Sequence, residues 1–238
     1  MSAVILDGPT GGGGRLIGPL IAKDLGYDYV DRLILTEAAR HIGATVEALH
    51  QREEKVPSRA DQFSSLLQRI LERSASGNLG TDPYFGAGGM AFLTEEYDDL
   101  EPSIITRSNE VQDDLYVEAV SKVINGLADE GNVVIVGRGS PIILSGREDV
   151  LRVGLVANLQ ERISRVMKIW GLNLDDAKSM ISRRDDARLY YVKRYFGVDS
   201  PDAAEIYHMV INTSFVSEEY ARDLIVEASK LLREGHLS

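Results

Sequence analysis

Six glycines lie within the eleven residues from Gly8 to Gly18, directly after a short apolar run. Glycines let backbone N–H groups turn inward around phosphate oxygens, and the helical pattern that follows would add the positive end of a helix dipole. The stretch therefore predicts a phosphate-binding loop between a strand and a helix. The residues expected to bind phosphates there are Gly8, Thr10, Gly11, Gly12, Gly13, Gly14 and Arg15.

This loop lacks the lysine that phosphate-binding loops normally carry. Against the pattern G-x-x-x-x-G-K-[ST], Gly8 and Gly13 have the right spacing, but Gly14 stands at the Lys position and Arg15 at the Ser or Thr position. The loop thereby loses a positive charge on the β- and γ-phosphates and a hydroxyl that helps to hold Mg²⁺. Arg15 can restore the charge only from one position later, about 100° further round a helix. The alternative is a glycine-rich turn without a ligand.

Arg138 lies between two glycines, directly after a second all-apolar run at 133–136. Ligands of open parallel sheets sit outside the carboxyl ends of the strands, so Arg138 can face the same crevice as the glycine loop. A guanidinium fork suits a phosphate. The alternative is an arginine in a solvated turn.

Basic residues crowd one short window of an otherwise acidic chain. Arg183, Arg184 and Arg188 are interleaved there with Asp185. Such a segment can close over transferring phosphates, where spread positive charge stabilises the transition state and a lid keeps water away. The alternative is a solvated helix with ion pairs. Asp185 and Asp31, the latter after a predicted strand, are candidate carboxylates for orienting an acceptor or contacting Mg²⁺ through water.

Composition narrows the class of protein. The 238 residues suffice for one α/β domain with insertions, and the net charge of −11 opposes broad attraction to nucleic acid or to an anionic membrane. We therefore expect no nucleic acid polymer and no membrane as partner. The absence of cysteine fits a cytoplasmic protein, and the four scattered histidines argue against a histidine-based metal site.

Buried strands alternate with helices along the chain. Apolar runs predict strands at 3–6, 27–30, 133–136, 151–156 and 209–211, and helical periodicity predicts helices at 15–25, 115–127, 159–170, 174–182, 188–196 and 217–233. Gly26 is the expected stop of the first helix, and Ser217 the expected N-cap of the last. This alternation predicts an α/β fold, a doubly wound parallel sheet of about five strands.

A long segment without a strand pattern separates the second and third predicted strands. It contains helical periodicity at 33–42, 46–51 and 62–73, followed by a glycine-rich stretch at 74–103 with several aromatic residues. This stretch is interpreted as a surface loop, with ligand cover or an oligomer contact as the alternative. We treat 1–238 as a single domain with an insertion at 37–115.

Taken in order, these stretches resemble the cytidylate kinase-like family, which is of the nucleoside monophosphate kinase type and has a P-loop NTPase fold. The resemblance is carried by the segments 8–15, 25–31, 134–138, 183–191 and 211–214. Gly13-Gly14-Arg15 is the most specific part, because this family also has Gly-Gly-Arg without the lysine. The resemblance covers most of residues 3–229.

The resemblance implies ATP-dependent phosphoryl transfer, with Mg²⁺, to a nucleoside monophosphate such as CMP or dCMP, or to a related small acceptor. It implies an acceptor-side insertion at 37–115 and an arginine-rich lid at 181–201. Apart from the resemblance, a homodimer is left open. The implied catalytic residues are Arg138, Arg183, Arg184, Asp185 and Arg188. Asn212 and Thr213 would join the glycine loop at the donor nucleotide, and Asp31 and Arg138 would lie on the acceptor side.

Two departures leave alternatives open. Cytidylate kinases proper carry an acidic residue on each side of the Gly-Arg pair, where this chain has Val136 and Gly139. The identity of the base on the acceptor nucleotide is therefore left open. The missing lysine also leaves a second function, a catalytically weak or inactive nucleotide-binding sensor.

Overall fold

The computed structural model of the protein describes residues 2–31, 35 and 107–237. Five strands form one parallel sheet in the order β2-β3-β1-β4-β5. The strands are β1 (Ala3–Asp7), β2 (Asp28–Val30), β3 (Val133–Val136), β4 (Val150–Val156) and β5 (Met209–Asn212). This confirms the predicted doubly wound parallel sheet.

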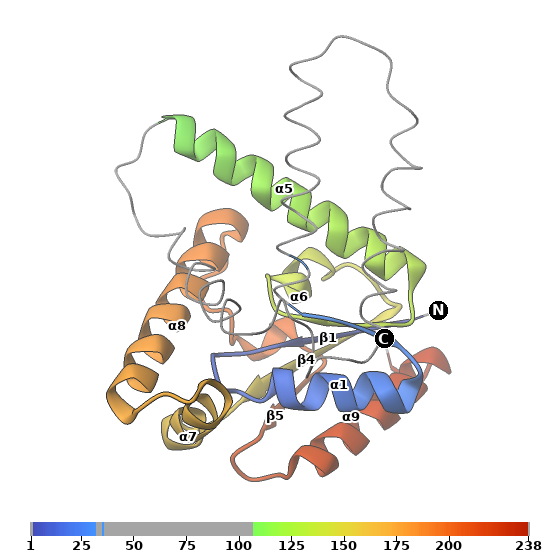
Figure 1. Ribbon diagram of the computed structural model, residues 1–238. Coiled ribbons are helices and arrows are strands. Elements are labelled where there is room, and N and C mark those ends of the chain that lie inside the picture. The colour runs from blue at the N-terminus through green and yellow to red at the C-terminus, as the bar shows by residue number, and fades with distance from the viewer. Residues whose placement is uncertain (1, 32–34, 36–106, 238) are drawn as a thin grey trace, which may run out of the picture.

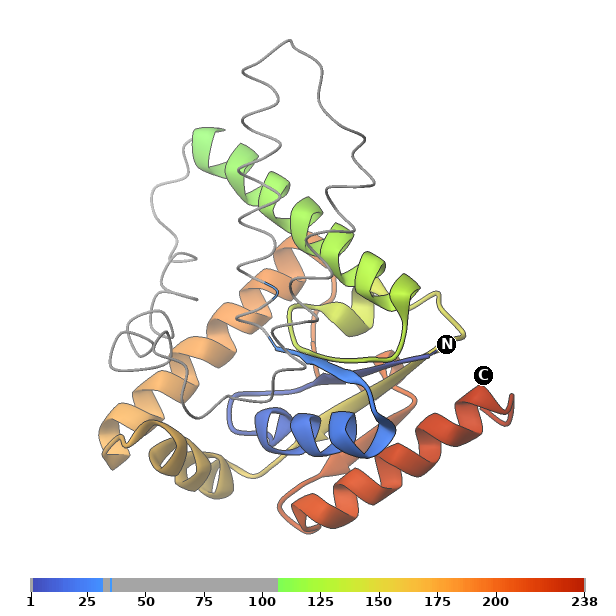
Figure 2. The same cartoon turned by 45° about the vertical axis from the view of Figure 1, so that its right-hand side comes forward.

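Helices cover both faces of the sheet (Figure 1). One face carries α1 (Gly14–Leu25) and α9 (Glu218–Arg233), and the other carries α5 (Arg107–Glu130) and the short α6 (Ser140–Ile143). Figure 2 shows the same two layers from a second side. The helices α7 (Leu159–Trp170) and α8 (Leu174–Phe196) pack on each other, and a single 3₁₀ turn, Ala204–Ile206, precedes β5.

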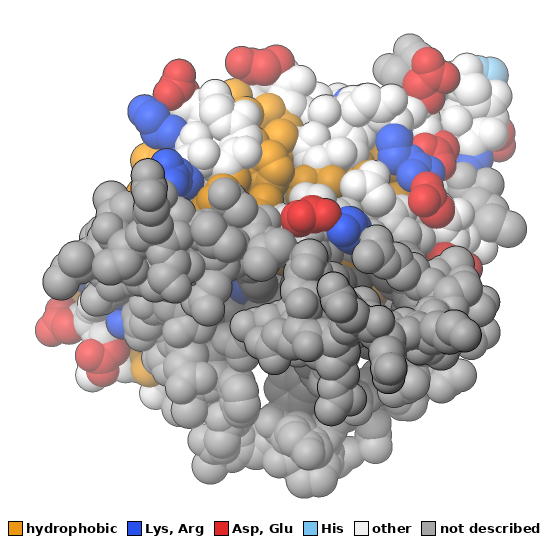
Figure 3. Space-filling model, turned by 90° about the horizontal axis from the view of Figure 1, so that it is seen from above, with side chains coloured by type: hydrophobic (Ala, Val, Ile, Leu, Met, Phe, Trp, Pro, Cys, Tyr) orange, Lys and Arg blue, Asp and Glu red, His pale blue; other side chains and the backbone are white. Residues whose placement is uncertain are grey.

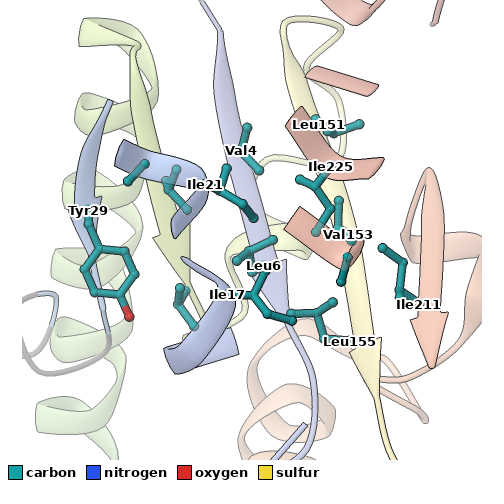
Figure 4. Close-up of a cluster of buried hydrophobic side chains, with 14 of the residues drawn as sticks. Val4, Leu6, Ile17, Ile21, Tyr29, Leu151, Val153, Leu155, Ile211 and Ile225 are labelled. Carbon is teal, nitrogen blue, oxygen red and sulfur yellow. The ribbon is translucent and has the colours of Figure 1, made fainter. Parts of the chain in front are cut away.

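Residues of β1 alternate between two hydrophobic cores. Ala3 and Ile5 pack into the core beneath α5, whereas Val4 and Leu6 pack into the core beneath α1 and α9. Figure 4 shows the second core, with side chains of β1, β4 and β5 meeting those of α1 and α9. Burial on both faces explains why the strands are continuous apolar runs rather than alternating ones.

The strand register brings the chemistry-bearing residues to one edge. Leu6 of β1 is level with Val136 of β3, and Asp7 is level with Gly154 of β4. The glycine loop after β1 and the turn after β3 therefore leave the sheet at the same carboxyl edge. This is the edge where open parallel sheets bind ligands.

The predicted helix ends at Gly26 and Ser217 are confirmed. Gly26 has φ 66°, and its N–H donates to the carbonyls of Ala22 and Lys23 at the end of α1. The hydroxyl of Ser217 accepts a hydrogen bond from the N–H of Tyr220 in the first turn of α9. Short polar side chains and glycine thus mark these boundaries for the reasons expected.

The prediction of two separate helices at 174–182 and 188–196 is wrong, because α8 is continuous across the arginine-rich segment. Its buried face runs through Ala177, Met180 and Ile181 and continues through Arg184 and Arg188. Since two arginines occupy positions where a helix normally buries apolar side chains, hydrophobic periodicity cannot reveal the middle of this helix.

Several predicted elements lie outside the described residues. These are the helices at 33–42, apart from the helical Leu35, and at 46–51 and 62–73, and the irregular stretch 74–103. In the part of the chain that is described, no helix has the length and apolar character needed to cross a membrane.

Where Figure 3 colours the surface, it shows a band of hydrophobic side chains with charges of both signs at its margins.

Candidate active site at the glycine loop

A pocket opens over the glycine loop at the carboxyl edge of the sheet. Its described lining consists of the loop at 7–16, the turn at 136–139, Leu155 of β4, and parts of α7 and α8. Arg15, Arg138, Arg165 and Arg188 all belong to this lining. In a chain with a net charge of −11, the pocket therefore gathers positive charge.

Arginines of α7 hold the outer side of the loop. Nε of Arg162 donates to the carbonyl oxygen of Thr10 at 2.8 Å, and Nη1 of Arg165 donates to that of Gly11 at 3.1 Å. Both arginines lie on one face of α7, three residues apart, which is the spacing at which helical side chains are neighbours. The loop backbone is thus fixed by charged side chains from a separate element.

Thr213, after β5, holds the next carbonyl. Its Oγ1 donates to the carbonyl oxygen of Gly12 at 2.9 Å and accepts from Nη1 of Arg165 at 2.7 Å. Because N–H and C=O of one planar trans peptide point in opposite directions, the N–H groups of Gly11 and Gly13 face away from these partners. With the first N–H groups of α1, they form an arrangement suited to an anion.

Backbone crowding explains the glycines. A Cβ at Gly8 would lie 2.0 Å from the carbonyl oxygen of Leu155, and a Cβ at Gly12 would lie 2.6 Å from the same atom. Gly13 has φ 113°, which side chains rarely tolerate. Gly8 and Gly12 therefore serve the close approach of the loop to β4, and Gly13 serves a backbone turn.

Asp185 is committed to the loop. Its Oδ1 accepts a hydrogen bond from the N–H of Thr10 at 2.9 Å, and its Oδ2 pairs with Arg162. The sequence predicts Asp185 as a catalytic carboxylate, whereas the structure holds both of its oxygens in contacts that join α8, α7 and the loop.

Arg188 lies buried between two carboxylates. Its Nη2 is 3.0 Å from Oδ2 of Asp7 at the end of β1, and its Nη1 is 2.8 Å from Oδ1 of Asp202. Burial alone would lower the pKa of Arg188, but the charges of Asp7 and Asp202 outweigh it and raise the pKa. The guanidinium is therefore charged and oriented at the wall of the pocket.

Arg15 and Arg184 meet at the ring of Trp170. The guanidinium carbon of Arg15 lies 5.6 Å from the ring centroid, and that of Arg184 lies 5.2 Å from it. Arg15 also lies 3.6 Å from Oδ2 of Asp31, the residue after β2. The loop arginine, the carboxylate after β2 and one arginine of α8 are thereby connected.

Arg138 is buried in a strained turn. It is one of two non-glycine residues with positive φ in the described chain, at 58°. Such strain persists where the surrounding structure imposes it, frequently at functional sites. The next residue, Gly139, also has positive φ, and a Cβ there would lie 3.0 Å from the ring of Phe196. A side chain at position 139 would therefore be strained and would need the ring of Phe196 to shift.

Six predicted residues lie outside the pocket lining: Asp31, Arg183, Arg184, Asp185, Asn212 and Thr213. Arg183 is exposed on α8. Asn212 is exposed at the end of β5, where its Oδ1 accepts from the N–H of Ser214. By contrast, Thr213, Asp185 and Arg188 converge on the loop from different elements.

Four residues at the site have no predicted role in the sequence: Asp7, Arg162, Arg165 and Trp170. Signals for them were present but weak. Asp7 is an acidic residue at the carboxyl end of a buried strand, and Arg162 and Arg165 share a helix face. Trp170 is the single tryptophan of the sequence. Their partners lie far away in the chain, so only the fold assembles them.

The sheet order and the glycine loop between β1 and α1 define a doubly wound α/β fold with a glycine-rich loop at its ligand-binding edge. The chain belongs to the cytidylate kinase-like family, whose model matches residues 4–215. This membership supports a kinase-like role on a nucleotide or another small molecule.

Individual relatives are distant. A cytidylate kinase of Methanopyrus kandleri is 30% identical over a region that covers 45% of this chain and 59% of that protein, so the match spans less than two thirds of that relative. A cytidylate kinase of Streptococcus equi subsp. zooepidemicus is 24% identical, with 76% and 78% covered. An uncharacterized protein of Eubacterium ventriosum of known structure has a TM-score of 0.60 at 16% identity, with 97% and 99% covered, and supports the fold alone.

Proposed function

We propose that the protein transfers the γ-phosphoryl group of ATP·Mg²⁺ to a nucleoside monophosphate, with CMP and dCMP as the first candidates. The observation that carries this proposal is that side chains from other elements fix the carbonyl groups of the glycine loop. Thr213 and the arginines of α7 hold the carbonyls of residues 10–12, which leaves the N–H groups of Gly11 and Gly13 for phosphate oxygens. The names of the relatives support the choice of acceptor.

In this proposal, arginines supply the charge that the missing lysine would bring. Arg15, Arg138, Arg165 and Arg188 line the same pocket as the loop. Phosphoryl transfer asks little covalent chemistry of a protein, so catalysis would consist of positioning and charge neutralisation. Arg138, fixed in a buried turn, is the residue best placed to hold one orientation.

Mg²⁺ would arrive with the phosphates of ATP. Mg²⁺ is commonly bound by one or two carboxylates together with substrate phosphates and water. Within the described ranges, no group of three or more His, Asp or Glu side chains is placed to hold a metal ion. The chain's own contribution would be the loop N–H groups and the arginines that orient the same phosphates.

Asp31 and Arg138 would face the acceptor. Asp31 follows β2 and Arg138 follows β3, and these strands are neighbours in the sheet. Because position 139 is a glycine, recognition of the acceptor base would use residues other than an acid there. CMP, dCMP and other monophosphates are therefore all included in the test below.

The segment 181–201 would act as the lid. It comprises the second half of α8 and the turn after Gly197, and it brings Asp185 and Arg188 to the loop. Closure over ATP would exclude water from the transferred group. The insertion at 37–115 would complete the acceptor side.

A second candidate is a nucleotide-binding sensor with little or no turnover. The observation that favours it is the neutralisation of two pocket arginines. Arg15 lies beside Asp31, and Arg188 lies between Asp7 and Asp202. If these pairs persist with ATP bound, less positive charge remains for the transition state.

The test is ADP release from ATP·Mg²⁺ with a panel of nucleoside monophosphates and small acceptors, using the full chain. Arg138→Ala is compared with Arg233→Ala, an exposed arginine at the end of α9. Turnover that falls at least about 100-fold in Arg138→Ala but not in the control supports the kinase. ATP binding without turnover on any acceptor supports the sensor, and absence of ATP binding rejects both functions.

A further inference from the structure

Trp170 lies where α7 ends, beside the glycine loop. It is 8% exposed, lines the pocket and packs with Ile163 and Val166 in the small core between α7 and α8. Its ring also contacts two guanidinium groups, those of Arg15 and Arg184. A residue that serves only a hydrophobic core does not need to gather two cations.

The two arginines differ in how much water they reach. Arg184 is 1% exposed and lies on the inner face of α8, whereas the side chain of Arg15 is 30% exposed at the pocket. A guanidinium removed from water needs electrostatic compensation. The face of an indole ring attracts cations more strongly than that of any other side chain, and the attraction grows when water is excluded.

Two contacts together restrain Arg15. Its guanidinium has the ring of Trp170 at 5.6 Å and the carboxylate of Asp31 at 3.6 Å. A flexible side chain with one partner keeps much of its rotational freedom, whereas two partners from separate elements restrict it. This matters because Arg15 follows the usual lysine position by one residue and therefore does not inherit the lysine's direction.

We propose that Trp170 is a positioning residue for phosphoryl transfer, whose indole ring holds Arg15 beside the glycine loop and fixes Arg184 behind it. This inference rests on the function proposed above and deepens it. The ring thereby places positive charge next to a loop that has Gly14 at the lysine position. Arg15 touches the phosphates, and Trp170 acts through Arg15.

Substitution of Trp170 by phenylalanine and by leucine separates this role from simple packing. Both changes remove volume from the same core, so both lower the free energy of unfolding. Phenylalanine keeps an aromatic face for the guanidiniums and leucine does not. We expect kcat to fall about tenfold in Trp170→Leu with the KM for ATP changed less than about twofold, and Trp170→Phe to keep most of the activity.

Tryptophan emission supplies a second readout, because Trp170 is the single tryptophan of the chain. We expect ATP·Mg²⁺ to change the emission of the unmodified protein, Arg15→Gln to lose most of that change, and Arg15→Lys to retain part of it. Emission that does not respond to ATP at concentrations that saturate turnover overturns the proposal.

The remaining outcomes separate this inference from the proposed function. If the unmodified protein turns over and the phenylalanine and leucine variants lose activity equally, in step with their stability, Trp170 is a packing residue and only this inference fails. The same holds if neither variant changes kcat. If the unmodified protein neither binds ATP nor turns over any acceptor, the proposed function fails, and this inference fails with it.

Discussion

Oδ1 of Asp185 accepts a hydrogen bond from the backbone N–H of Thr10 at 2.9 Å, across 175 positions of the sequence. The other carboxylate oxygen pairs with Arg162, whose Nε also donates to the carbonyl oxygen of Thr10. The carboxylate of Asp185 and the guanidinium of Arg162 thus bind the backbone N–H and the backbone carbonyl of Thr10. The glycine loop, α7 and α8 are joined at this point.

The first prediction concerns Asp185→Asn. The amide keeps an acceptor for the N–H of Thr10 but loses the charge that pairs with Arg162. The loop should therefore keep its position but be held less firmly. We expect the free energy of unfolding to fall by about 1 to 2 kcal/mol and the KM for ATP to rise several-fold, with kcat changed less than about tenfold. Urea denaturation and steady-state kinetics measure these effects.

Asp186→Asn is the matched control, because Asp186 is the exposed neighbour on α8. It should leave both stability and KM unchanged. A loss of kcat of about 100-fold or more in Asp185→Asn, with stability intact, would contradict this account. It would indicate that Asp185 leaves the loop and acts on the reacting groups.

The second prediction concerns the close approach of Gly8 to β4. In Gly8→Ala, the added Cβ would meet the carbonyl oxygen of Leu155 at 2.0 Å, and backbone cannot move aside cheaply. We expect a loss of stability of about 2 kcal/mol or more, together with weaker ATP binding, because the loop shifts away from β4. Thermal unfolding and ATP titration measure both effects.

Gly146→Ala is the control for this substitution. A Cβ at Gly146 meets nothing within 4 Å, and Gly146 is absent from the positive-φ glycines. Its stability should stay the same or rise slightly, because alanine restricts the unfolded chain. Equal stability of the Gly8 and Gly146 variants would refute the steric explanation of the glycine loop.

The sheet was predictable because a strand that is buried on both faces, such as Val133–Val136, is an uninterrupted apolar run in the sequence. The glycine loop was predictable because its tight turns and close backbone contacts require glycine, which can be recognised in the sequence. The clamp on the loop was not predictable, because Arg162, Thr213 and Asp185 gain their roles from partners in distant segments. Likewise, the path of α8 through Arg184 contradicts the usual apolar pattern and needs the ring of Trp170 to explain it.

The third prediction concerns the buried pair of Asp7 and Arg188. Both side chains are at least nine-tenths buried, so loss of Arg188 leaves the charge of Asp7 with little water, and loss of Asp7 leaves the more exposed Asp202 as the remaining carboxylate partner of Arg188. We expect Asp7→Asn and Arg188→Met each to lower the free energy of unfolding by about 3 kcal/mol or more. The double variant should cost clearly less than both single changes together. Urea denaturation of the four proteins measures this coupling.

Asp202→Asn serves as the control for this cycle. Asp202 pairs with the same guanidinium but is 41% exposed, so water screens its charge. Its substitution should cost about 1 kcal/mol or less. If Asp202→Asn proves as costly as Asp7→Asn, the placement of Asp7 as the dominant partner of Arg188 is wrong.

The last prediction concerns pH and His208. Its Nδ1 accepts a hydrogen bond from the N–H of Arg152, whose carbonyl in turn accepts from the N–H of His208. Burial, and then the charge of Arg152, lower the pKa of His208 below its usual 6.5. The folded protein therefore binds this proton less readily than the unfolded chain, so the stability is fully present above pH 6.5 and declines as the pH falls through the lowered pKa.

His208→Asn should flatten this decline, since an amide oxygen can accept the same hydrogen bond without titrating. The measurement is the urea midpoint from about pH 7.5 to about pH 5, where the unmodified protein should lose more stability than the variant. His236→Asn, an exposed site near the end of the chain, should follow the unmodified protein. Parallel curves for His208→Asn and the unmodified protein would show that protonation of His208 does not open the contact between β4 and the start of β5.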